Sequence, residues 1–129
     1  MTNASTLIYV AGPFSAPTRE GVEANILRAA LRGVEVAKLG ACPVVPHSNT
    51  SLPQYETVQP YEFWIEATLA LMHRCDALLT VSGWEASSGA RGEVTAMMRS
   101  GKPVFHNLGT LAEWLKSRGG EALAGGEAK

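Results

Sequence analysis

Hydrophobic residues in this chain follow two alternating patterns, short continuous runs and longer stretches with helical spacing. The short runs, which predict strands covered on both faces, lie at residues 6–12, 42–48, 76–83 and 102–107. The stretches with an apolar side chain every three or four positions, which predict amphipathic helices, lie at residues 19–39, 61–74, 88–100 and 110–117. This alternation predicts a single-domain α/β fold, a Rossmann/flavodoxin-like parallel sheet of about four to five strands flanked by helices.

Three further segments predict a loop, a disordered tail and a contact with a partner subunit. Residues 48–60 combine prolines and turn residues without a period, which predicts a loop long enough to act as a functional lid. Residues 119–129 lack apolar bulk and predict a disordered tail, so the folded domain is expected at residues 1–118. The helix at residues 61–74 is apolar around most of its circumference, which predicts a homodimer or higher homo-oligomer that covers the surplus.

Composition narrows the possible classes of protein. The chain has 129 residues, 46% of them hydrophobic, and a formal charge of −1, which is typical of one globular domain and offers no basic region for a nucleic-acid polymer. Cys42 and Cys75 show no metal-ligand spacing, so we expect no metal and no cofactor. Residues 1–12 resemble neither a signal peptide nor a membrane span, so no membrane partner is expected and the predicted location is the cytoplasm.

Ligands of parallel α/β sheets bind beyond the carboxyl ends of the strands, where loops lead into helices. That rule selects three stretches here, at residues 12–18, 46–51 and 83–93. In the first stretch, backbone N–H groups at the start of a helix are candidates to hold an anion, and Gly12 would let a ligand approach closely. The stretch matches neither a dinucleotide motif nor a nucleoside-triphosphate motif, so an ordinary proline-rich turn is the alternative.

Polar side chains in the other two stretches are candidates to contact the same ligand. His47 follows the second predicted strand, so its side chain is expected in the cleft, and a turn residue is the alternative. Ser87 and Ser88 precede the third helix, and at least one of them is expected to cap it. The other hydroxyl, with the N–H groups of Gly89 and Ala90, would form a phosphate or oxyanion site.

Glu93 is a carboxylate in a helix where an apolar residue would be ordinary. It lies at the edge of the face that carries Ala90, Val94 and Met97, not on the polar side of the helix. A carboxylate held there can act as a nucleophile toward an electrophilic carbon or as a general base. The structural alternative is a buried salt bridge to Arg19 or Arg74.

The chain resembles the nucleoside 2-deoxyribosyltransferase superfamily, which includes nucleoside 5′-monophosphate N-glycosidases, in "IYVAGPF", "LALMHRCDALLTVSGWEASSGARGEV" and "GKPV". In that family a glutamate on the third helix attacks the anomeric carbon of the sugar, and this position corresponds to Glu93. A tyrosine of the first strand that holds the glutamate corresponds to Tyr9, and a phosphate-contacting serine corresponds to Ser87. His47 matches, more loosely, a cleft histidine of the hydrolases.

The resemblance implies an enzyme that cleaves the N-glycosidic bond of a (deoxy)nucleoside 5′-monophosphate and releases or exchanges the base. Ser87 favours a nucleotide, since the transferases tend to carry an aspartate there, and Phe14 or Trp84 is expected to stack on the base. The substrate-binding residues then expected are Gly12, Pro13, Phe14, Ser15, His47, Trp84, Ser87, Ser88 and Gly89. The alternatives are a nucleoside 2-deoxyribosyltransferase acting on free nucleosides and a catalytically weak nucleotide-binding or sensing module.

One position departs from the family pattern. The family usually carries an active-site aspartate eight residues before the aspartate that opens the third strand, and the corresponding residue before Asp76 is Thr68. Threonine cannot act as a general acid near neutral pH, so Glu62, Glu66 or His47 would have to replace it, or base protonation occurs differently, or the activity is weak. Asp76 itself is expected to be structural.

Overall fold

The computed structural model describes residues 3–50 and 58–127, with the side chains of that part except those of Thr50 and residues 119–127. The described strands are β1 Asn3–Ala11, β2 Ala41–Val44, β3 Ala77–Thr80 and β4 Val104–Phe105. The described helices are α1 Arg19–Lys38, α2 Pro46–Thr50, α4 Tyr61–His73, the short 3-10 helix η1 Trp84–Ala86, α5 Ser88–Arg99 and α6 Leu108–Glu127. In this part of the chain, none of the helices is both long and apolar enough to cross a membrane.

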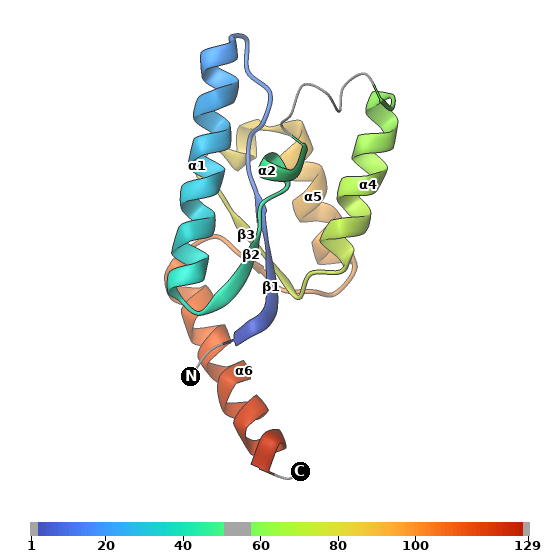
Figure 1. Cartoon of the computed structure of the whole chain (residues 1–129). Coiled ribbons are helices and arrows are strands. Elements are labelled where there is room, and N and C mark those ends of the chain that lie inside the picture. Colours follow the sequence, from blue (N-terminus) through green and yellow to red (C-terminus); the bar gives the residue numbers. More distant parts are fainter. Residues whose placement is uncertain (1–2, 51–57, 128–129) are drawn as a thin grey trace.

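The strands form one parallel sheet in the order β2-β1-β3-β4, and helices cover both of its faces (Figure 1). On one face, Ile8 and Val10 of β1 pack in a core that α1 and α6 complete. On the other face, Tyr9 and Ala11 pack in a second core, to which α4 and α5 contribute. These observations confirm the predicted α/β fold, and the two-sided burial of β1 explains why its sequence is nearly continuous in apolar residues.

The ends of α1 follow from capping residues. The Thr18 hydroxyl accepts a hydrogen bond from the Gly21 N–H at 3.1 Å, which satisfies one free donor of the first turn. Beyond Lys38, Gly40 has a φ of 87°, a left-handed conformation that favours glycine, and this confirms the predicted helix stop.

Several element boundaries differ from the sequence predictions. The second strand ends at Val44 and not at residue 48, because Pro46 opens α2, and proline is tolerated in the first turn of a helix. The closing helix runs from Leu108 to Glu127, well beyond the predicted residues 110–117. It therefore continues into the segment predicted as a disordered tail, where residues 121–124 favour a helix and the glycine pairs on either side of them disfavour one. Most of the predicted lid, residues 51–57, lies outside the described residues.

Asp76 joins the first strand to the third. Its backbone N–H donates to the Leu7 carbonyl at 2.8 Å, and its Oδ2 accepts from the Leu7 N–H at 2.8 Å. Arg118 lies 3.8 Å from the other carboxylate oxygen. Asp76 therefore has the structural role that the sequence indicated.

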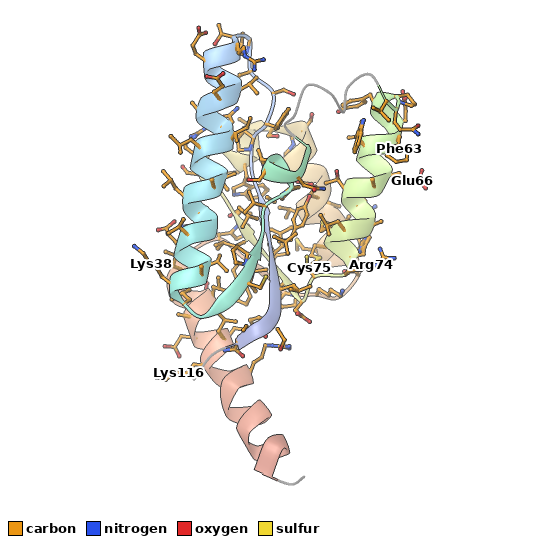
Figure 2. The ribbon with its side chains drawn as sticks, viewed as in Figure 1. Lys38, Phe63, Glu66, Arg74, Cys75 and Lys116 are labelled. Atoms are coloured by element: carbon orange, nitrogen blue, oxygen red, sulfur yellow. The ribbon has the colours of Figure 1, made fainter. Side chains whose placement is uncertain are left out.

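Helix α4 carries several exposed apolar residues. Tyr61 is 74% exposed, Phe63 42% and Ile65 44%. Figure 2 shows Phe63 and the exposed Glu66 on the side of α4 that faces away from the sheet. The surplus apolar surface expected from the sequence is present, while the partner subunit that would cover it stays a prediction.

Candidate functional site

The three predicted loops meet at the carboxyl edge of the sheet. The His47 ring nitrogen Nε2 donates a hydrogen bond to the Pro13 carbonyl at 2.9 Å. The His47 ring also lies 5.5 Å from the ring of Phe14, at an interplanar angle of 53°. Gly83 of the third loop is close to the first loop, since a Cβ added to it would lie 3.6 Å from Pro13 Cγ. Residues 33 or more positions apart thus form one site, as the fold rule predicts.

Tyr9 and Glu93 form the central polar pair of this site. The Tyr9 hydroxyl donates a hydrogen bond to Glu93 Oε2, which links β1 to α5. Burial raises the pKa of Glu93 to about 7, although the hydrogen bond from Tyr9 lowers that pKa and so opposes the rise. Burial, followed by the charge of Glu93, raises the pKa of Tyr9 above its ordinary range, so Tyr9 stays protonated and acts as the donor.

The salt-bridge alternative for Glu93 is wrong. Arg19 pairs with Glu23 at 3.3 Å, and Arg74 donates to the Ala70 carbonyl at 2.9 Å. No cation pairs with Glu93 in the part of the chain that the structure describes. A partly buried carboxylate beside a phenol and without a cation is unfavourable to ionise, which is a common property of catalytic groups. The neighbouring Gly92 has no atom within 4 Å of where a Cβ would lie, apart from its own helix backbone and chain neighbours, so the space at Gly92 itself is open.

Ser87 is the N-cap of α5. Its hydroxyl accepts a hydrogen bond from the Ala90 N–H at 3.2 Å, and Ser88 is the first residue of the helix. The Ala90 N–H is already bonded to Ser87, so it is not available for the predicted anion site. Among the described residues, the N–H groups of Ser88 and Gly89 have no acceptor, so these two donors and the positive helix end are the groups available to an anion.

His47 is a neutral hydrogen-bond acceptor. Its side chain is 5% exposed, and burial lowers its pKa, although backbone contacts with Pro13 and Gly12 oppose that effect. Because the Pro13 carbonyl can only accept, the ring proton is assigned to Nε2. The buried Nδ1 then carries a lone pair and has no partner among the described residues. His47 is suited to accept from a hydroxyl or a water, but not to act as an acid at neutral pH.

Thr68 does not replace the missing aspartate. Its hydroxyl donates to the Trp64 carbonyl of its own helix at 2.6 Å. It lines a small cavity of about 120 Å³ together with Asn49 and Leu71. The two glutamates proposed as substitutes, Glu62 and Glu66, are exposed on α4. The described residues therefore place no acidic side chain at this position.

Gly12 is required by the packing of the sheet. A Cβ at this position would lie 2.6 Å from Val81 Cβ and 2.8 Å from Val81 Cγ2. The close approach observed at Gly12 is between the segments that follow β1 and β3, whereas the close approach of a ligand that the sequence suggested stays a prediction.

Gly12→Ala is expected to destabilise the protein by about 1–3 kcal/mol, because the added methyl overpacks a buried contact. Thermal unfolding measures the loss. Gly12→Ala should cost much less in a Val81→Gly background, compared with Val81→Gly alone, because that change removes the Val81 Cβ as well as its methyl groups. An unchanged melting temperature in Gly12→Ala would contradict this account.

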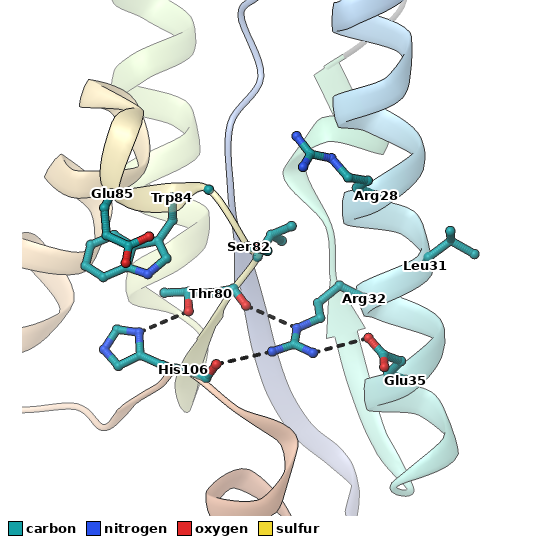
Figure 3. A pocket seen from close by; sticks show the side chains of 11 residues that line it. Arg28, Leu31, Arg32, Glu35, Thr80, Ser82, Trp84, Glu85 and His106 are labelled. Atoms are coloured by element: carbon teal, nitrogen blue, oxygen red, sulfur yellow. Dashed lines mark hydrogen bonds and ion pairs between the residues drawn. The ribbon is translucent and has the colours of Figure 1, made fainter.

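Trp84 lies at a second cavity, beside the site and on the α1 side of the sheet edge (Figure 3). Its ring stacks on His106, with centroids 5.1 Å apart and planes within 14°. The cavity has a volume of about 470 Å³, and neither Tyr9 nor Glu93 lines it. Phe14, which is 37% exposed next to His47, is therefore the better placed of the two aromatic residues expected to stack on a base.

Arg32 closes this second cavity and was not singled out from the sequence. Its Nε donates to the Thr80 carbonyl at 3.1 Å, and its Nη2 donates to the His106 carbonyl at 3.4 Å. Its remaining partner is Glu35, at 3.3 Å. Because Thr80 and His106 lie on elements other than α1, no local sequence pattern could have indicated these two contacts.

Comparison with known proteins identifies a family without an assigned function. The domain of unknown function DUF1937 matches residues 6–108. No curated protein matches the chain. In the structure, the described residues contain no group of three or more histidine, cysteine, aspartate or glutamate side chains placed to hold a metal ion.

Proposed function

We propose that this chain, which belongs to the DUF1937 family of domains of unknown function, cleaves the N-glycosidic bond of a (deoxy)nucleoside 5′-monophosphate. The observation that carries the proposal is the Tyr9–Glu93 pair, a partly buried carboxylate whose partner is a neutral hydroxyl. The resemblance to the nucleoside 2-deoxyribosyltransferase superfamily supports the same roles for these two residues.

The reaction would proceed in two displacements. In the first, the ionised Glu93 oxygen forms a bond to the anomeric carbon, and the bond to the base nitrogen breaks with its electron pair remaining on the base, which takes a proton from water. In the second, water adds to the anomeric carbon, releases the Glu93 carboxylate and loses a proton to solvent. Glycosidases of ordinary sugars use two carboxylates. A nucleobase is a better leaving group than a sugar alkoxide, so one carboxylate is sufficient here.

The start of α5 is the proposed phosphate site. The N–H groups of Ser88 and Gly89 and the positive helix end favour an anion. Glu93 lies six residues after Ser87, which corresponds to about 9 Å along the helix axis. Side chains of a helix tilt toward its N-terminus, so the Glu93 carboxylate lies nearer to that anion than its Cα does.

The Ser87 hydroxyl accepts from the Ala90 N–H and keeps its own hydrogen to donate to a phosphate at this site. Ser87→Ala is therefore expected to weaken the reaction of monophosphates about tenfold more than that of free nucleosides, because a hydrogen bond to a charged group contributes about 1.5–3 kcal/mol. The measurement is kcat/KM for matched nucleotide and nucleoside pairs. Ser87→Thr, which keeps a capping hydroxyl, is the control and should retain the preference. Equal losses for both substrates in Ser87→Ala would contradict the phosphate site.

The direct test of the proposed function is to incubate the protein with a panel of nucleotides, deoxynucleotides and the matching nucleosides, and to detect free base by chromatography. We expect base release from at least one monophosphate. Adding a foreign base to the same mixture distinguishes hydrolysis from transfer, since a transferase would produce the exchanged nucleoside or nucleotide. Release from no member of the panel would count against the proposed activity.

A second candidate function, nucleotide binding without turnover, is favoured by one observation. The Thr68 hydroxyl is bonded within its own helix, so the position of the family's aspartate carries no acid. Saturable nucleotide binding without base release, in the wild type and in Thr68→Asp alike, would support this candidate over the enzyme.

A further inference from the structure

The helix α1 exposes a row of large apolar residues on the side that faces away from the sheet. Leu27 is 58% exposed, Leu31 54% and Val34 49%. The buried residues of the same helix are Asn25, Ala29, Gly33 and Val36. With a turn of about 100° per residue, the exposed row lies opposite the centre of the buried row. A helix packed on a sheet normally carries polar residues there, so this row is not explained by the fold.

The exposed row continues to both ends of the helix with a regular spacing. The exposed residues Glu20, Ala24, Leu27, Leu31, Val34 and Lys38 follow one another at intervals of four, three, four, three and four. This is the spacing of the contact positions in two helices that pack side by side. The row begins with an acidic residue and ends with a basic one, and Figure 2 shows Lys38 extending outward from α1.

We propose that this outer row of α1 binds the same row of a second copy of the chain, with the two helices antiparallel. One antiparallel register matches all six positions of the row with positions of the same row in the second copy. In this register, Leu27 faces Leu31 of the second copy. Ala24 then faces Val34 of the second copy, a small residue against a larger one. At both ends, Glu20 faces Lys38 of the second copy. A two-fold axis repeats each contact, as expected for a closed dimer.

The charges select the antiparallel orientation. In a parallel pair, Glu20 would face Glu20 of the second copy and Lys38 would face Lys38, which places like charges together at both ends. The charged residues beside the row already have partners in their own helix. Arg19 pairs with Glu23 at 3.3 Å, and Arg32 pairs with Glu35 at 3.3 Å. The end charges of the row are therefore the ones that distinguish the two orientations.

The first test measures the mass of the full chain in solution by sedimentation velocity over a series of concentrations. We expect a dimer for the wild type and a dissociation constant raised roughly 100-fold in Leu31→Glu, since a leucine is lost from each side of the contact centre. Met98→Glu is the matched control, because Met98 is a similarly exposed apolar residue on α5, and it should leave the dimer intact. Ile65→Glu tests the exposed apolar surface of α4, which the sequence predicts to be covered by a partner subunit. A monomeric wild type, or dissociation by Ile65→Glu but not by Leu31→Glu, would overturn the proposal.

The second test addresses the antiparallel pairing. Glu20→Lys alone and Lys38→Glu alone should each weaken the dimer, because each places like charges at both ends. The double variant restores opposite charges and should return the dissociation constant to near the wild-type value. Variants on this exposed surface are expected to fold, which circular dichroism checks. A double variant no tighter than the single variants would overturn the proposed orientation.

Discussion

Glu93→Gln is expected to abolish base release, with a rate loss of roughly 10³ to 10⁶, while nucleotide binding stays close to that of the wild type. An amide cannot form the bond to the anomeric carbon, but it has almost the same shape as the carboxylate. Its oxygen can still accept the hydrogen bond that the Tyr9 hydroxyl donates to Glu93. Single-turnover base release and equilibrium binding of the same nucleotide separate the two effects.

The stability of this variant is its internal control. Because burial raises the pKa of Glu93 from 4.5 to about 7, ionisation of Glu93 removes stability as the pH rises across that range. Glutamine has no such charge, so above pH 7 the variant should be at least as stable as the wild type. Glu85→Gln, on the exposed η1, is the matched control and should keep its activity. Near-normal base release by Glu93→Gln would exclude the proposed nucleophile.

Tyr9→Phe is expected to shift the pH dependence of the reaction. In the wild type, kcat/KM should rise with pH and level off above about 7, as Glu93 ionises. The Tyr9 hydrogen bond lowers the pKa of Glu93, so its removal raises that pKa and moves the rise to higher pH. The loss should therefore be about 10- to 100-fold near pH 6, as expected for a hydrogen bond to a charged group, and smaller in alkaline solution.

The pH profile of kcat/KM shows whether the Tyr9 hydroxyl positions and stabilises the charged Glu93 or whether Tyr9 only fills space in the core. Tyr9 is fully buried, and phenylalanine keeps the ring that fills its place in the core. A loss that is the same at every pH would mean that the hydroxyl does not act through Glu93. Tyr61→Phe, at an exposed position, is the control for the loss of a tyrosine hydroxyl and should leave the profile unchanged.

Local patterns in the chain were sufficient to predict the sheet and to mark Glu93 as a candidate functional residue. The run that forms β1 is apolar because both faces of a central parallel strand are buried, and that burial is visible as a pattern. Glu93 stood out since it lies on the apolar edge of a helix. Its pairing with Tyr9 followed from the resemblance to a family, and the structure places the two side chains in contact.

Other features depended on contacts between distant segments. The Nε2–H of His47 is held by the carbonyl of Pro13, 34 positions away, and only that contact assigns the free lone pair to Nδ1. The ring of Trp84 stacks on His106 and lines the neighbouring cavity, a placement that depends on a residue 22 positions away. The packing reason for Gly12 likewise comes from a distant residue, since Val81 occupies the space where a Cβ would lie.

The sequence by itself therefore determined the order of strands and helices, the edge of the sheet that carries the site, and the position of the carboxylate. These follow from hydrophobic periodicity, which each segment expresses locally because burial acts on its own side chains. The tertiary structure decided which groups are protonated, which donors remain free and which face of α1 is exposed. Those properties depend on the distances between groups that are far apart in the sequence and that only folding brings together.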